Sequence, residues 1–213
     1  MSRVDDAQAI AALTGVLDRM PRRPDVWVRA SENSGHVGAV LAEAALQAGL
    51  NYESVVVPRV KRFVKEYPAA ASVSGLAALL GSGDIAVVLG INNARKCRTF
   101  SDLAHLLTAE GVETADQLRT WIERSDSRSK LLRVPGVGVK TAAYIRLLLG
   151  LPAIAIDVHL RRAASEVGVV CSDEELERLY TLAAVHAGVA LAELDGSLWQ
   201  QGADQSKKRR QSR

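Results

Sequence analysis

The sequence is poor in cysteine, in aromatic residues and in long apolar runs, and these shortages exclude several classes of protein. Its two cysteines, Cys97 and Cys171, are too few for a disulfide framework or for the four thiolates of an iron–sulfur cluster. There is no run of 18 apolar residues, so a membrane span is not expected. The first residues lack the basic segment and long apolar core of a signal peptide, and we therefore expect a cytoplasmic protein.

The formal net charge of +3 comes from the end of the sequence rather than from the whole chain. Five of the last seven residues are basic, and without them 22 basic residues stand against 24 acidic ones, a net charge of −2. Global charge therefore does not indicate DNA binding. Between Arg124 and Arg162, however, eight residues are basic and two are acidic, which makes this stretch a basic neighbourhood.

Alanine and leucine dominate, and aromatic residues amount to 4% of the chain, which favours helix over strand. Apolar spacing, interrupted by glycine and proline, predicts an all-α fold of ten or so short helices. The predicted helices span residues 5–20, 35–48, 51–67, 73–80, 83–89, 94–107, 114–124, 157–168, 172–188 and 190–201, with a helix-turn-helix over 127–149. Residues 206–213 are predicted to form a disordered basic tail.

The strongest functional signal is the tight turn Val134-Pro135-Gly136-Val137-Gly138 between two apolar helical runs. Glycine permits left-handed backbone angles and lets a phosphate approach closely. The helix that follows points unpaired N–H groups at such a phosphate, and its dipole favours the negative charge. We therefore predict a DNA-phosphate site at the turn, although an ordinary helical hairpin is the alternative. The residues assigned to this site are Gly136, Val137, Gly138, Lys140 and Thr141.

This turn, read with the segment that follows it, resembles the helix-hairpin-helix (HhH-GPD) DNA glycosylase superfamily, and within it the endonuclease III-like branch. The resemblance is carried by Leu-x-x-Val-Pro-Gly-Val-Gly-Val-Lys-Thr-Ala and by Pro152-Ala-Ile-Ala-Ile-Asp157. Weaker matches at Leu46-Gln47 and at Gly90-Ile-Asn-Asn-Ala-Arg-Lys96 extend it over roughly residues 35–200. It implies a two-lobed helical fold. The expected lobes are a terminal lobe of residues 1–29 and 151–205 and a barrel lobe of residues 30–150 that contains the hairpin.

The resemblance also implies an enzyme that flips a damaged or mispaired base out of double-stranded DNA and removes it. Asp157 would stabilise the cationic sugar, and it alternatively caps the next helix. Lys140 would attack C1′ of the sugar and form a Schiff base, which adds AP lyase activity. Gln47 would enter the space left by the flipped base. Further DNA contacts are assigned to Lys96, His159 and Arg161, whereas Tyr144 is interpreted as a core residue.

Several features depart from the endonuclease III pattern. No cysteine follows Cys171, so the four-cysteine iron–sulfur cluster of that branch is not expected, nor is any metal site apart from a monovalent cation at the hairpin carbonyls. Val158 replaces a usual threonine, and the interval from Lys140 to Asp157 is one residue short.

Three interpretations stay open: a glycosylase with lyase activity, a monofunctional glycosylase in which Lys140 only grips DNA, and a non-catalytic DNA-binding or lesion-sensing protein. In each we expect a nucleoid-associated monomer that binds double-stranded DNA with a damaged or abasic site and does not bind membranes.

Overall fold

The computed structural model describes residues 6–19, 32–156 and 158–189, and within them it contains helices and no strand. The all-α prediction is therefore confirmed. The chain folds as two compact units, one made of Met1–Ala30 with Pro152–Arg213 and the other of Ser31–Leu151. The predicted lobe boundaries at residues 29/30 and 150/151 stay a prediction. The predicted helix 190–201, the basic tail 206–213 and Asp157 lie outside the described residues.

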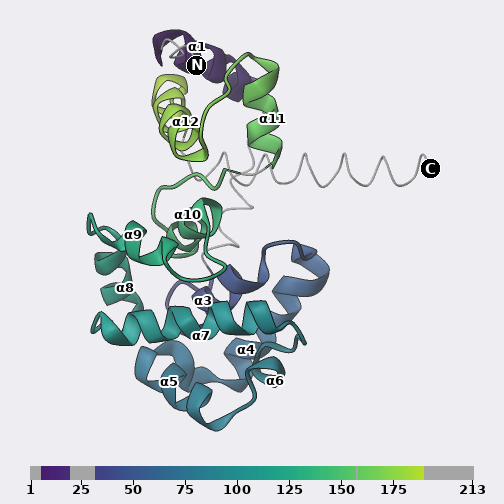
Figure 1. The fold of residues 1–213 in the computed structure, drawn as a ribbon, viewed down its shortest axis with the longest axis vertical. Helices are drawn as coiled ribbons and strands as arrows, with labels where there is room; N and C mark the ends of the chain where they lie inside the picture. Colours follow the sequence, from purple (N-terminus) through teal and green to yellow (C-terminus); the bar gives the residue numbers. More distant parts are fainter. Residues whose placement is uncertain (1–5, 20–31, 157, 190–213) are drawn as a thin grey trace, which may run out of the picture. The chain divides into compact units, whose positions relative to one another are not determined.

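The larger unit, residues 31–151, is a helical assembly in which α7 runs from end to end (Figure 1). In that view α4, α5 and α6 lie on one side of α7, and α8, α9 and α10 lie on the other. Its helices are α3 (Val37–Leu46), the π-helix η1 (Tyr52–Val56), α4 (Val57–Glu66), the 3-10 helix η2 (Pro68–Ala71), α5 (Val73–Ser82), α6 (Ile85–Leu89), α7 (Ala94–Ala109), α8 (Ala115–Ile122), α9 (Ser127–Leu132) and α10 (Val139–Leu148).

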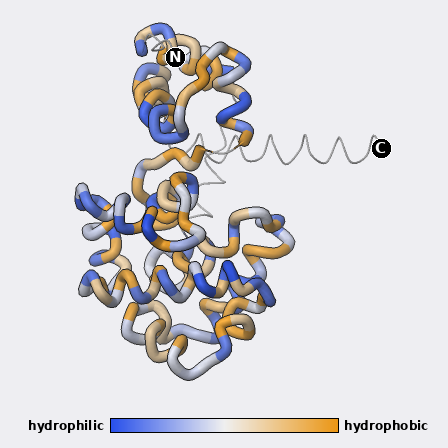
Figure 2. Tube along the Cα trace, in the orientation of Figure 1, coloured by the Kyte–Doolittle hydropathy of each residue, from blue (hydrophilic) through white to orange (hydrophobic). Residues whose placement is uncertain are grey.

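The centre of this unit is α3, in which every residue is buried. Its sequence, VGAVLAEAAL, is apolar on all sides apart from Glu43, as expected for a helix surrounded by others. Helices α4, α7 and α10 pack against it, so α3 connects the hairpin helix to the rest of the core. Along the outer helices of this unit, hydrophobic and hydrophilic residues are mixed (Figure 2).

Most helix boundaries follow from capping residues. Side-chain oxygens of Ser72, Asp84, Asn93 and Thr114 accept main-chain N–H bonds at the starts of α5, α6, α7 and α8. Asp84 is the reason that the helix predicted over 83–89 begins at Ile85.

The helix predicted over 51–67 is present as a continuous helical segment of two types. The Asn51 side chain caps a π-helical turn, and a regular α-helix begins only at Val57, with Pro58 in its first turn. Proline has no N–H to offer the preceding turn, and this explains why the change of helix type occurs at this point.

The smaller unit has its own core, built from α1 (Asp6–Asp18), α11 (Val158–Glu166) and α12 (Asp173–Ala187). Helices α1 and α12 form its main packing contact, and Leu13, Leu160 and Tyr180 are fully buried. The Tyr180 hydroxyl donates to the Leu160 carbonyl at 2.9 Å. At the surface the Arg178 guanidinium pairs with Asp6 at 2.9 Å. Within the described part of the chain, no helix is long and apolar enough to cross a membrane.

Candidate nucleic-acid interface and active site

The turn between α9 and α10 has the hydrogen bond and the residue pattern of a type II turn. The Val137 N–H donates to the Val134 carbonyl at 3.0 Å and closes the turn over Pro135 and Gly136. Gly136 has a φ of 91°, in the left-handed region that the third residue of this turn requires. Proline is favoured at the position before it. The Pro-Gly pair therefore fixes the reversal of the chain between the two helices.

Thr99 on α7 braces this turn from the side of the core. Its buried hydroxyl lies 2.8 Å from the Pro135 carbonyl and 3.0 Å from the carbonyl of Arg95, one turn earlier on α7. A Cβ on Gly136 would lie 2.2 Å from the Thr99 Oγ1. Glycine is thus needed at residue 136 both for its backbone angle and for the close approach of α7, and the hairpin is held to the core by this approach.

The N-terminus of α10 is open at the exposed side of the turn. Gly138 is its N-cap residue and supplies no side chain to cap the helix. The first N–H groups of α10, at Val139, Lys140 and Thr141, are those that an α-helix leaves without a helical acceptor. Thr141 is buried, so its hydroxyl is not counted in this site. These groups and the positive end of the helix dipole form a site suited to an anion.

Lys140 lies in the first turn of α10 and is half-buried. Its amine has no hydrogen-bond or ion-pair partner within the described residues. Val137, which was also predicted to contact DNA, uses its N–H inside the turn and buries its side chain. Among the described residues, Lys140 and the first N–H groups of α10 are therefore the groups of the hairpin without a polar partner, and they are the candidates for contact with a ligand.

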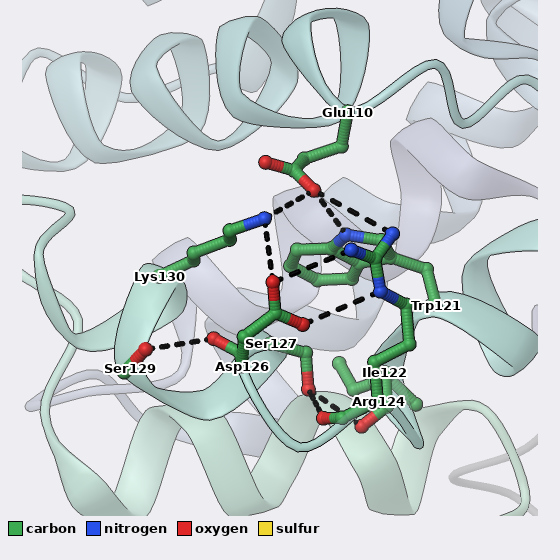
Figure 3. A network of polar contacts seen from close by, with 8 residues as sticks. All are labelled: Glu110, Trp121, Ile122, Arg124, Asp126, Ser127, Ser129 and Lys130. Atoms are coloured by element: carbon green, nitrogen blue, oxygen red, sulfur yellow. Dashed lines mark hydrogen bonds and ion pairs between the residues drawn. The ribbon is translucent and has the colours of Figure 1, made fainter.

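An ion-pair network holds α9, the first helix of the hairpin, to α7 and α8 (Figure 3). The Glu110 carboxylate accepts from the Lys130 ammonium at 2.7 Å and from the Trp121 indole N–H at 2.9 Å. Asp126 lies 2.8 Å from the same ammonium and 3.3 Å from the Arg124 guanidinium. The hydrogen bond from Lys130 is the main reason that the pKa of Glu110 falls below its usual range.

The network reduces the positive charge that the sequence predicts around the turn. Arg124 and Lys130 are neutralised by acidic partners, one of which, Glu110, lies outside the basic neighbourhood in sequence. The exposed residues Arg95 and Arg133 have no polar side-chain partner among the described residues. The cationic charge left for a ligand near the turn is therefore smaller than the sequence count indicates, and Arg95, Arg133 and Lys140 contribute to it.

A buried acid lies between α3 and α10. Glu43 is 4% exposed, and its Oε1 accepts from the Tyr52 hydroxyl at 2.7 Å and from the Tyr144 hydroxyl at 2.9 Å. Burial raises the pKa of Glu43, and the two hydroxyls only partly oppose this effect. Burial and the neighbouring carboxyl also raise the pKa of Tyr144 well above its ordinary value. Tyr144 is thus half-buried with a polar partner, not a purely apolar core residue.

The structure gives Lys96 a role within the protein. Its ammonium donates to the carbonyls of Ala45, Leu46 and Ala48 at 3.0, 3.0 and 2.8 Å, which uses its three donors at the C-terminus of α3. We therefore do not include it among the proposed DNA contacts. Gln47 is the C-cap residue of the same helix, and its side-chain Nε2 is buried without a hydrogen-bond partner among the described residues.

The remaining predicted contacts belong to the smaller unit. His159 is half-buried in the first turn of α11. Arg161 is exposed and makes a bidentate pair with Asp173, with an Nη2–Oδ1 distance of 2.7 Å. Asp157 lies outside the described residues. The DNA-binding roles of His159 and Arg161 therefore stay predictions.

Two important residues were missed in the sequence. Glu43 is the only charged residue in the apolar stretch of α3, and that isolation was a signal of a functional or structural role. Thr99 gave no signal, because its partner, Pro135, is 36 residues away in sequence.

The comparisons with known proteins agree with this geometry. No protein-family model matches the chain. The crystal structure of the H. pylori 3-methyladenine DNA glycosylase bound to 1,N6-ethenoadenine is similar, with a TM-score of 0.61 and 15% identity, over 95% of this chain and 99% of that one. A thermostable thymine-DNA glycosylase is similar with a TM-score of 0.50 and 15% identity, over 90% of this chain and 83% of that one.

A sequence relative gives a local match. Endonuclease III of Bacillus subtilis (strain 168) is 42% identical over 43 residues, and this match spans 20% of each protein. The chain therefore has the fold of the helix-hairpin-helix DNA glycosylases, as the sequence predicted.

Proposed function

We propose that this protein is a DNA glycosylase that removes a damaged or mispaired base from double-stranded DNA and cleaves the resulting abasic site through Lys140. The observation that carries the proposal is the Pro135-Gly136 turn held by Thr99, followed by an open helix N-terminus whose lysine has no polar partner among the described residues. In a chain with a glycosylase fold, this arrangement combines a phosphate grip with a candidate nucleophile. We further propose that the protein acts as a monomer without an iron–sulfur cluster.

DNA binding would centre on the start of α10. The phosphate would accept from the N–H groups of residues 139–141 and approach over Gly138, where the surface is open. Arg95 and Arg133 would add phosphate contacts beside the turn, because both side chains are exposed and without ionic partners among the described residues. Phosphate contacts of this kind position the duplex and do not select its sequence. A monovalent cation at the hairpin carbonyls stays a prediction.

The proposed reaction uses the amine of Lys140 as nucleophile and the carboxylate of Asp157 as electrostatic stabiliser. The neutral Lys140 amine attacks C1′, the C1′–N bond breaks, and the base leaves with the bonding electrons and takes up a proton. Opening of the sugar ring then gives a Schiff base, and elimination cuts the strand on the 3′ side. The Asp157 carboxylate would stabilise the positive charge that develops on the sugar.

A monofunctional glycosylase is the second candidate. It is favoured by the position of Lys140 beside the open N–H groups, where an ammonium can simply neutralise the bound phosphate. In that case water would attack C1′, and no covalent adduct would form.

Borohydride trapping distinguishes the two candidates. The native protein is incubated with abasic-site DNA and with oligonucleotides that carry a panel of damaged or mispaired bases. We expect a covalent adduct that Lys140→Ala abolishes and that Lys61→Ala, which changes an exposed lysine on α4, retains. Base release without an adduct would support the monofunctional enzyme instead. Binding of damaged DNA with neither base release nor adduct would support a non-catalytic protein.

The role of Asp157 has a separate test. Asp157→Asn keeps the size of the side chain and removes its charge, so we expect base release at saturating protein to fall on the order of 100-fold or more. DNA affinity should change little. Full base release by this variant on the true substrate would show that the assignment is wrong.

A further inference from the structure

One hydrogen-bonded cluster joins the two helices that carry candidate functional residues of the larger unit. Glu43 lies on α3, whose C-cap residue is Gln47, and Tyr144 lies on α10, which has Lys140 in its first turn. The bond from the Tyr144 hydroxyl to the Glu43 carboxyl crosses between these helices at 2.9 Å. It adds a directional polar contact to the packing of α10 against α3.

The spacing along each helix makes this bond relevant to the site. Lys140 and Tyr144 are four residues apart on α10, and Glu43 and Gln47 are four residues apart on α3. Residues at this spacing lie on the same face of a helix, one turn or about 5.4 Å apart. The bonded pair therefore joins the face of α10 that carries Lys140 to the face of α3 that carries Gln47.

Tyr52 gives the cluster a second bond to Glu43, and its hydroxyl also interacts with that of Tyr144. Its hydroxyl donates to the same Glu43 oxygen at 2.7 Å, but it belongs to η1 and not to α10. A buried polar group without a partner is costly, so both hydroxyls and the carboxyl stabilise the arrangement together. Of the two bonds, the one from Tyr144 is the bond that holds α10.

We infer that Glu43 is a positioning residue, which fixes α10 against α3 through Tyr144 and so sets the place of the Lys140 amine relative to bound DNA. The reaction of Lys140 in this inference rests on the proposed function. The link between α3 and α10, which we call the tether, is the observed hydrogen bond from Tyr144 to Glu43. Catalysis depends steeply on such placement, because a misplacement of about 1 Å can slow a reaction about 100-fold.

The test compares Tyr144→Phe with Tyr52→Phe, which removes a hydroxyl from the same carboxyl oxygen but leaves the bond between Tyr144 on α10 and Glu43 in place. Trapping rates are measured in single turnovers at saturating abasic-site DNA, and the Kd for that DNA is measured in parallel. We expect Tyr144→Phe to slow trapping on the order of 10-fold with a Kd within about 2-fold of native. Tyr52→Phe should stay within about 3-fold of the native rate. Equal rates for the two variants would overturn the inference.

Two changes at Glu43 complete the test. Glu43→Gln keeps an oxygen that accepts from both hydroxyls and should retain most of the native rate. Glu43→Leu removes the acceptor at similar volume and should slow trapping at least as much as Tyr144→Phe. If the cluster only stabilised the fold, the trapping rate of the four variants would fall in proportion to their loss of stability. Our inference predicts instead that the rate falls in the variants that lose the hydrogen bond between Tyr144 and Glu43.

Hydrogen exchange tests the contact between α10 and Glu43 without relying on the reaction of Lys140, so the tether can be right or wrong independently of the proposed function. Without DNA, the amides of residues 142–148 should exchange faster in Tyr144→Phe than in Tyr52→Phe. If the native protein forms no adduct but this difference is found, the lyase proposal fails and the tether stands. If Lys140 forms an adduct but neither trapping nor exchange distinguishes the two tyrosines, the lyase proposal stands and the tether is wrong.

Discussion

At the scale of single residues, Gly136 illustrates how two independent constraints meet at one position. Its φ of 91° excludes most side chains on conformational grounds, and the Thr99 hydroxyl excludes a Cβ on steric grounds. Relief of one constraint would not relieve the other. The nearby Gly138 carries neither constraint, since its φ is −104° and a Cβ added there would have no neighbouring atom within 4 Å.

We predict that Gly136→Ala destabilises the protein by at least about 1–3 kcal/mol, because both the backbone angle and the contact with Thr99 become strained. Gly138→Ala is the matched control and should change the free energy of unfolding by less than about 1 kcal/mol. Urea denaturation of both variants measures the difference. DNA affinity should fall in Gly138→Ala despite its stability, because the added methyl group lies where the phosphate would approach.

Glu43 makes stability depend on pH in an unusual direction for an acid. Its pKa is raised in the folded protein above the ordinary value of 4.5, so the folded state holds its proton where the unfolded state releases it. The contribution of this titration to the free energy of unfolding is fully present below pH 4.5 and is lost as the pH rises through the raised pKa. Glu43→Gln removes the titration.

We therefore predict that the free energy of unfolding of Glu43→Gln, measured relative to the native protein, increases between about pH 5 and about pH 8. The increase should amount to about 1.4 kcal/mol for each pKa unit by which Glu43 is raised. Urea titrations at both pH values measure it, and all other titrating groups cancel in the difference. A relative stability that stays constant would mean that Glu43 has an ordinary pKa.

At the scale of secondary-structure elements, the end of α3 depends on Lys96 from α7. Two of the three carbonyls that it binds, those of Ala45 and Leu46, belong to the last turn of α3, which a helix leaves unpaired, and the third, that of Ala48, lies just beyond it. Lys96→Met keeps the aliphatic length and removes the donors, so we predict a loss of about 1–3 kcal/mol in the free energy of unfolding. Lys61→Met, at an exposed site on α4, should change it by less than about 0.5 kcal/mol. Thermal and urea unfolding of the two variants give the comparison.

The elements that the sequence predicted well are those with local signals. Helices over 94–107 and 172–188 became α7 and α12 within two residues at each end, because Asn93 and Ser172 cap their starts. The turn at residues 134–138 was recognisable from its glycines. The change of helix type within 51–67 was not recognisable, because a π-helix has no local pattern that separates it from an α-helix with Pro58 inside it.

The contacts within the candidate site could not be predicted because they join residues that are distant in sequence. The partners of Glu43 and Pro135 come from residues up to 101 positions away, and such pairs exist only once the helices have packed. The same holds for charge, since Lys96 and Lys130 looked like cations available to DNA. In the structure one caps a helix and the other pairs with Glu110 and Asp126.

At the scale of the whole molecule, residues 31–151 contain a continuous core, the hairpin and Lys140, while Asp157 belongs to the other segment. We predict that residues 31–151 expressed alone unfold cooperatively and bind abasic-site DNA, but release no base. Circular dichroism during heating, DNA binding and base-release assays test the three parts. A fragment that lacks a cooperative transition would show that the larger unit needs the smaller one to fold.

The pairing of α1 with α12 has a consequence for the order of events during synthesis. Asp6 and Arg178 are 172 residues apart, so α1 leaves the ribosome long before its partner exists. At about 5–20 residues per second, it waits on the order of 10 s or more with its apolar side exposed. The larger unit is complete in that interval. A chaperone that shields α1 would therefore act on this protein only while it is being made, and a gene rearranged so that α1 follows α12 would remove the need for it.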